Sequence, residues 1–154
     1  MSQGNKESGA DGTVTIHLPC QFEYLRIARQ SIIDFCIRAG LSDCKTAQLE
    51  MAVDEACANI IEHSYGKDPH NPTSSEHPGV QINLSTDEDR VMVEIIDYGS
   101  GYAEDTQQDI HPEEYIEANL QRGLGLYIIN NFVDEVDYKR NAETGNHLRL
   151  VKLL

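Results

Sequence analysis

The chain has few basic residues and no long apolar run. Of its 154 residues, 12 are Lys or Arg and 26 are Asp or Glu, which gives a formal net charge of -14. This balance argues against a nucleic-acid backbone or an anionic membrane as partner, because both attract positively charged surfaces. No apolar stretch approaches the roughly 18 residues that a membrane-spanning helix needs. We therefore expect no direct nucleic-acid partner and no membrane association, whereas a basic protein partner remains compatible with the charge.

The sequence also shows no paired cysteine ligands and no pattern of a signal peptide in residues 1–12. The cysteines (Cys20, Cys36, Cys44 and Cys57) form no C-x-x-C pair, so a zinc site is not expected. Unpaired cysteines are typical of a reducing compartment. Residues 1–12 are polar, rich in Gly and Ser, and lack the apolar core of a signal peptide, and we interpret them as a disordered tail. These features predict a cytoplasmic protein.

The two best-known phosphate-binding strings are absent. The chain contains neither G-x-x-x-x-G-K-[ST] nor G-x-G-x-x-G, so a nucleotide site would need another design. A hydrophobic fraction of 40% and a mean hydropathy of -0.45 indicate a globular chain. Its length fits one domain, over residues 13–154, which can bury roughly two-thirds of its unfolded surface.

Periodicity predicts alternating helical and extended segments. Apolar residues at helical spacing predict helices at 21–39 and 43–65, and another helix that opens near Arg122. A short helix at 112–120 is weakly indicated. Alternating residues predict strands at 13–18, 80–84, 90–96, 135–140 and 148–153, with turns at 87–89 and 143–146. Residues 67–79 form an unusually long loop, which indicates mobility or function.

A polar stripe accompanies the apolar face of the expected helix at 43–65. Glu55, Asn59 and His63 are spaced i, i+4, i+8, beside the face made by Leu49, Val53, Ala56 and Ile60. A carboxylate and a carboxamide one turn apart can hold a hydrated cation or a reacting hydroxyl in a pocket. A solvated polar flank explains the same pattern equally well.

A second candidate follows the strand expected at 90–96. Asp97 comes directly after apolar residues, so its carboxylate should be partly buried and in need of a donor, such as the exocyclic amine of a purine. Gly99 and Gly101 lack side chains that would keep a flat ligand from the backbone. The alternative is an ordinary turn, because D-x-G-x-G is a common turn string.

The third candidate is the run Arg122-Gly123-Leu124-Gly125-Leu126 at the start of a helix. Unpaired N–H groups and the helix dipole favour phosphate at such a position, and Arg122 adds further donors. The alternative is a glycine-rich loop that lets the helix pack closely on the sheet.

The three segments, in this order, resemble the Bergerat-type ATP-binding fold of DNA gyrase, heat-shock chaperones, sensor histidine kinases and mismatch-repair proteins. Residues 52–65 are similar to the first motif of the anti-sigma factor serine kinases, E-A-x-x-N-x-x-x-H-x-Y. That family's third motif is similar to residues 123–126 together with the Ile-Ile pair and Asp134-Glu135-Val136 that follow them. The resemblance covers about residues 13–153. It implies an α/β (α+β) two-layer sandwich, with a mixed, mostly antiparallel sheet and helices on one face.

The resemblance also implies roles for the candidate residues. Asn59 would ligate the Mg2+ that accompanies ATP or ADP, and Glu55 would be the catalytic general base toward a Ser or Thr hydroxyl. Asp97 would bind the adenine amine, with Gly99 and Gly101 shaping the base pocket. The run 122–126 would contact the phosphates, and residues 102–121 would form a lid. His63 is expected to have a supporting role rather than a catalytic one.

The function implied is an ATP-dependent serine/threonine kinase that is also an anti-sigma factor. Its implied partners are a sigma factor and an anti-anti-sigma (STAS-type) substrate, and relatives of this kind are homodimers. One alternative is a nucleotide-responsive binding module without kinase activity. The catalytic domain of a sensor histidine kinase is less favoured, because no dimerising helix with a phosphoacceptor His precedes the domain.

The chain departs from the family pattern in three places. The loop at 67–79 is longer than usual, and the expected lid is strongly acidic. The last motif, usually Gly followed by Thr, is Gly145-Asn146 here, so no contact from the terminal strand is carried over.

Overall fold

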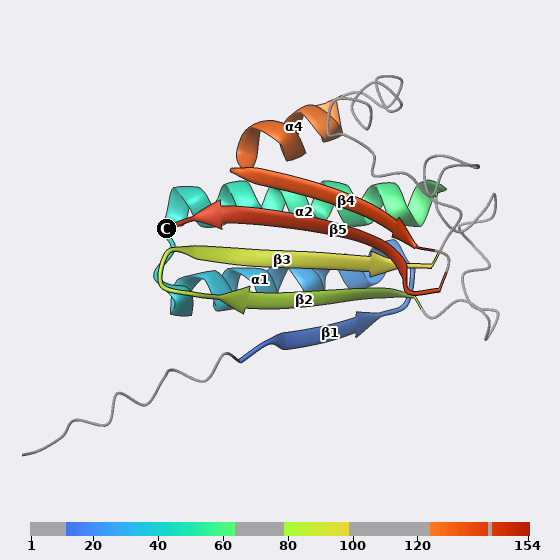
Figure 1. Cartoon of the computed structure of the whole chain (residues 1–154), viewed down its shortest axis with the longest axis horizontal. Coiled ribbons are helices and arrows are strands. Elements are labelled where there is room, and N and C mark those ends of the chain that lie inside the picture. Colours follow the sequence, from blue (N-terminus) through green and yellow to red (C-terminus); the bar gives the residue numbers. More distant parts are fainter. Residues whose placement is uncertain (1–11, 64–78, 99–123, 142) are drawn as a thin grey trace, which may run out of the picture.

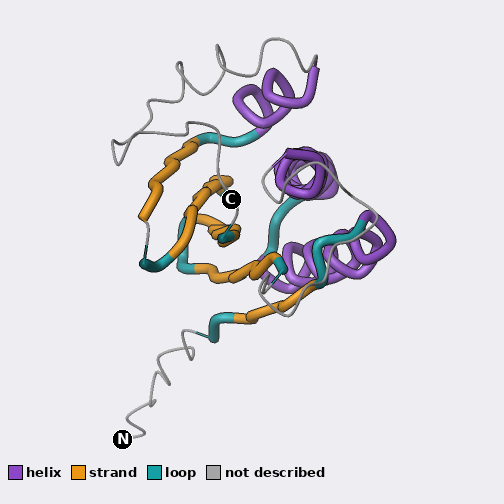
Figure 2. The backbone as a smooth tube through the Cα atoms, turned by 90° about the vertical axis from the view of Figure 1, so that its right-hand side faces the viewer, coloured by secondary structure: helices purple, strands orange, loops and turns teal. Residues whose placement is uncertain are grey.

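The structure is a computed structural model that describes residues 12–63, 79–98, 124–141 and 143–154. Within these ranges a five-stranded sheet carries its helices on one face, as Figures 1 and 2 show. The expected two-layer α+β sandwich is thereby confirmed. The helix expected at 112–120, the lid at 102–121, residues 67–78 of the long loop and all but the last residue of the tail lie outside the described residues.

The elements follow the order that periodicity predicts. They are β1 (Val14–Leu18), the short 3-10 helix η1 (Phe22–Tyr24), α1 (Leu25–Ala39), α2 (Asp43–His63), β2 (Val80–Thr86), β3 (Arg90–Asp97), α4 (Leu124–Phe132), β4 (Glu135–Asn141) and β5 (Gly145–Leu153). None of the helices in the described ranges has both the length and the apolar character needed to cross a bilayer.

The strands lie in the order β1-β2-β3-β5-β4. All pairings among these described strands are antiparallel, so the parallel part of the expected mixed sheet is not found in them. β5 lies between β3 and β4, and this position brings the last strand of the chain against the end of β3.

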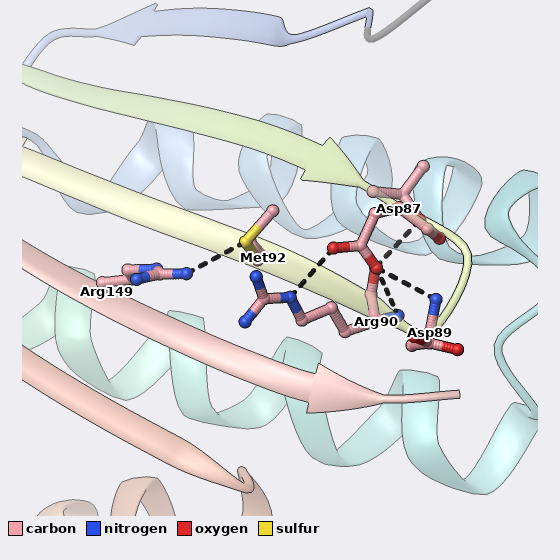
Figure 3. Close-up of polar contacts among 6 residues, drawn as sticks. Asp87, Asp89, Arg90, Met92 and Arg149 are labelled. Carbon is pink, nitrogen blue, oxygen red and sulfur yellow. Dashed lines mark hydrogen bonds and ion pairs between the residues drawn. The ribbon is translucent and has the colours of Figure 1, made fainter. Parts of the chain in front are cut away.

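A tight turn joins β2 to β3. Asp87 Oδ1 accepts the backbone N–H groups of Asp89 (2.9 Å) and Arg90 (3.1 Å), and its Oδ2 accepts Arg90 Nε at 3.0 Å. Figure 3 shows this cluster, together with the Arg149 guanidinium that donates to Met92 Sδ. The backbone bond from Asp89, assisted by Arg90, lowers the pKa of Asp87 below its ordinary value. The turn predicted at 87–89 is therefore built around one carboxylate.

The core lies between the sheet and the helices. α1 buries Leu25, Ala28, Ile32 and Cys36, and α2 buries the expected face of Leu49, Val53, Ala56 and Ile60. Gly40 ends α1 in a left-handed conformation with φ 88°. Ser42 caps α2, because its Oγ accepts the N–H of Lys45 at 3.3 Å. These contacts set the direction of α2, which carries the polar stripe.

The turn expected at 143–146 was placed too late in the chain. Asn141 Oδ1 accepts the N–H groups of Glu143 (2.8 Å) and Thr144 (3.1 Å), which closes the turn before Gly145. β5 therefore begins at Gly145, not at Leu148, and Asn146 pairs with Asp97 in the sheet.

Candidate functional site

The polar stripe of α2 is partly buried. Asn59 is only 6% exposed, and its Nδ2 has no hydrogen-bond partner among the described residues. Glu55, one turn earlier, is half-buried. A buried amide with an unused donor is costly in a finished core. Asn59 is therefore not part of a solvated flank, and another group is expected to complete its surroundings.

Glu55 is a weaker acid than an ordinary glutamate. Burial raises its pKa most, and the negative charges of Asp54 and Glu62 raise it further. A higher pKa makes the ionised carboxylate a better proton acceptor. The raised pKa is compatible with the general-base role that the family resemblance implies for Glu55.

An ion pair ties α2 to α1 beside this carboxylate. Arg29 Nε lies 3.6 Å from Asp54 Oδ1. Both side chains are partly exposed, so the pair contributes little to stability. It holds Asp54 toward α1.

Asp97 ends β3 and is buried, with 4% of its surface exposed. Asn146, 3% exposed, is its cross-strand partner in β5. Asn146 Nδ2 donates to Asp97 Oδ1 at 3.0 Å. The expectation of a buried carboxylate that needs a donor is confirmed, and one donor is supplied by the chain itself.

The start of β5 lies unusually close to the end of β3. A Cβ on Gly145 would stand 2.6 Å from the Asp97 carbonyl oxygen and 3.1 Å from the Tyr98 ring. Gly145 also has φ +96°, which favours glycine. Only a glycine lets the two strands approach in this way at the Asp97 end.

Two buried thiols are affected by the charge of this carboxylate. Burial raises the pKa of Cys20 to about 12, and the charge of Asp97 adds to the effect. Burial likewise raises the pKa of Cys57 on α2, with Asp54, Cys20 and Asp97 contributing. Both thiols therefore stay neutral.

The remaining candidates are only partly described. The carboxyl ends of α2 and β3 and the first residues of α4 and β5 lie at the same end of the molecule, on the right in Figure 1. Leu124, Gly125 and Leu126 open α4, which packs against α2. Gly99, Gly101, Arg122 and Gly123 lie outside the described residues, as does the His63 side chain.

Asn146 is the site residue that sequence reasoning missed. The replacement of Thr by Asn in the last motif was visible in the sequence, but nothing local indicated its partner. The signal lies in strand pairing, which places Asn146 opposite Asp97. Register is a property of the whole sheet rather than of either segment.

The chemistry of these groups fits a magnesium nucleotide. A carboxamide oxygen is a ligand that Mg2+ accepts, and Asn59 carries a buried carboxamide. A buried carboxylate such as Asp97 accepts hydrogen bonds from an amine. Glu55 adds a base one turn from Asn59. Together these groups can bind a base, hold a metal and accept a proton.

Comparisons with known proteins give the chain a family. Residues 18–152 match the histidine kinase-like ATPase domain. The serine-protein kinase RsbW of Bacillus subtilis is 31% identical over 133 residues, which cover 84% of this chain and 79% of that protein.

Two solved structures share the fold. The RsbU and RsbW domains of a Mycobacterium tuberculosis protein align with a TM-score of 0.63 at 17% identity, over 92% of this chain and 32% of that one. The SiaB-SiaC complex of Pseudomonas aeruginosa aligns with a TM-score of 0.55 at 12% identity, over 92% and 89%. This chain spans about a third of the Mycobacterium polypeptide. The chain belongs to the histidine kinase-like ATPase domain family and, within it, to the serine-protein kinases of the RsbW type.

Proposed function

We propose that the protein is an ATP-dependent serine/threonine kinase and an anti-sigma factor, which binds a sigma factor and phosphorylates an anti-anti-sigma protein. The observation that carries the proposal is the pairing on α2 of a buried Asn59 with a Glu55 of raised pKa. Asp97 is the last residue of β3, and the carboxyl ends of α2 and β3 lie at the same end of the molecule. Membership in a family of serine-protein kinases supports this assignment.

Each residue would have a distinct task. Asp97 would accept a hydrogen bond from the adenine amine and so orient the base, while Asn59 would hold the Mg2+ through its Oδ1. The metal, when bound with ATP, neutralises charge on the transferring phosphoryl group. Glu55 accepts the proton of the substrate hydroxyl as that oxygen bonds to the γ-phosphorus and ADP leaves. The run 122–126, at the start of α4, would contact the phosphates through backbone N–H groups.

A transfer assay tests this function. Labelled ATP and Mg2+ are incubated with the protein and a STAS-type anti-anti-sigma protein. Label should appear on a Ser or Thr of that protein, and replacement of the acceptor by Ala should abolish it. Nucleotide binding without transfer would instead support the nucleotide-responsive binding module.

The net charge and the family membership support the proposed partners. A net charge of -14 suits a basic sigma factor, and charge steering weakens as salt rises. Affinity for the sigma factor should therefore fall between low and physiological ionic strength, and an affinity insensitive to salt would contradict charge steering. We also propose a cytoplasmic homodimer, to be tested by sedimentation at micromolar protein concentration.

A further inference from the structure

The hydrogen bond between Asn146 and Asp97 has a consequence for nucleotide choice. We propose that Asn146 is a positioning residue that orients the Asp97 carboxylate and thereby sets selectivity for purine nucleotides with an amine at position 6. This inference rests on the proposed function, in which Asp97 reads the base. It assigns a role to the position where the chain departs from the family's Gly-Thr motif.

The strand pairing and a side-chain hydrogen bond both restrain the Asp97 carboxylate. Asp97 and Asn146 are register partners in β3 and β5, and their backbones are held by the ladder. The amide of Asn146 then donates to Oδ1 at 3.0 Å, with both side chains nearly inaccessible to water. A buried bond to a charged acceptor is stronger than an exposed one, so it resists rotation of the carboxylate.

Orientation matters because a carboxylate only accepts hydrogen bonds. A purine amine at position 6 donates to it, whereas a keto oxygen at that position would face it with lone pairs. A site built to bond a donor rejects an analogue that lacks the donor by large factors. Loss of the Asn146 bond removes one restraint on the carboxylate, and a less restrained, more hydrated carboxylate discriminates less between the two bases.

The test compares two nucleotides and two proteins. Binding of ADP and of inosine diphosphate, which carries a keto group at position 6, is measured by calorimetry for the wild type and for Asn146→Ala. Loss of a bond to a charged group should weaken ADP binding about 10-fold. The affinity for inosine diphosphate should change by less than about 2-fold. The ratio of ADP affinity to inosine diphosphate affinity should therefore fall several-fold.

Asn83→Ala is the matched control. Asn83 is also a sheet asparagine, with side-chain bonds to Thr15, Gln81 and Glu94 on neighbouring strand positions. Its removal should leave the ratio of ADP to inosine diphosphate affinity unchanged. Near-ultraviolet circular dichroism checks that each variant is folded.

The isosteric substitution Asn146→Asp gives a second test. The substitution replaces the donor by a second carboxylate next to Asp97, while the buried thiols of Cys20 and Cys57 stay protonated. ADP affinity should be weak at pH 8 and recover several-fold toward pH 5, because adjacent carboxyl groups then share a proton. Wild-type protein, measured in parallel, should not show this recovery.

The outcomes separate the inference from the function. Wild-type protein that binds no ADP would overturn both. A different result would overturn the role of Asn146 alone. In that case wild-type protein prefers ADP, but the Asn146 variants lose affinity for both nucleotides equally and at every pH. A selectivity ratio that falls only in the Asn146 variants supports the proposal.

Discussion

Asn146 donates a hydrogen bond of 3.0 Å to Asp97, across 49 positions of sequence. The two residues are buried cross-strand partners at the beginning of β5 and the end of β3. The bond links the last described strand to the carboxylate of Asp97, which we predict to bind a purine base. It makes the beginning of β5, at Gly145 and Asn146, part of the candidate site.

Replacement of Asp97 by Asn should weaken ADP binding about 10- to 100-fold. A carboxamide has one acceptor oxygen, so it cannot accept from both Asn146 and the adenine amine as freely as a carboxylate. Calorimetry with ADP measures the effect. Asp137→Asn on β4, where the carboxylate pairs only loosely with Lys139, is the control and should bind ADP normally. Unchanged binding by Asp97→Asn would remove Asp97 from the site.

Replacement of Glu55 by Gln should lower the rate of phosphate transfer about 100- to 10,000-fold, because Gln cannot accept a proton. Affinity for ADP should change little, since the side chain keeps its shape. Single-turnover transfer to the anti-anti-sigma protein and calorimetry report the two quantities. Glu50→Gln, on the same helix, is the matched control. A Glu55→Gln protein that transfers phosphate at the wild-type rate would exclude the base role.

Glu55 should also give a pH-dependent difference in stability. Its pKa in the folded protein lies above the ordinary value of 4.5, so the folded state binds more protons than the unfolded state. The protonated form is therefore the better tolerated, and stability falls as pH rises through the folded-state pKa. Glu55→Gln should melt higher than wild type at pH 7, and the difference should vanish below about pH 4. Equal melting temperatures at pH 7 would contradict the burial of this carboxylate.

Gly145→Ala should destabilise the protein more than Gly40→Ala. Both glycines have positive φ, which costs an alanine about 1 kcal/mol. At Gly40 a methyl group meets nothing within 4 Å, whereas at Gly145 it would meet the Asp97 carbonyl oxygen at 2.6 Å. We expect a loss of about 3 kcal/mol or more in the free energy of unfolding at Gly145, measured in urea. Similar losses at the two positions would mean that β5 and β3 do not approach closely.

Asp87→Ala should lower the melting temperature by a few degrees at neutral pH, because the turn between β2 and β3 loses three acceptor contacts. The pKa of Asp87 is depressed in the folded state, so its contribution is full above the ordinary value of 3.8 and is lost as pH falls through the folded value. The difference from wild type should therefore shrink at strongly acidic pH. Glu88→Ala, in the same turn, is the control and should melt like wild type.

The helices and strands were predictable because their signals are local. Gly40 and Ser42 mark the boundaries of α1 and α2, and the alternation in β2 and β3 matches their burial. The turn before β5 was misplaced because the decisive contact is a side-chain bond. The Asn141 side chain closes the turn before Gly145, and the residues 143–146 alone do not predict this contact.

The candidate site was predictable in part. The spacing of Glu55 and Asn59 and the position of Asp97 after apolar residues are local patterns, and the structure confirms the burial that the sequence predicted for Asp97. The burial of Glu55 and Asn59 was not predictable, since a polar stripe at the edge of an apolar face is compatible with either a pocket or a flank.

By itself, the sequence determined the local elements and the kinds of chemical group that each one carries, because hydrogen bonds within helices and alternation along strands depend on neighbours in the chain. Only the tertiary structure decided that Asn146 faces Asp97, that Cys20 and Cys57 are buried within reach of the charge of that carboxylate, and that Asn59 is removed from water. These relationships depend on strand order and register, which arise from packing of the whole sheet against its helices.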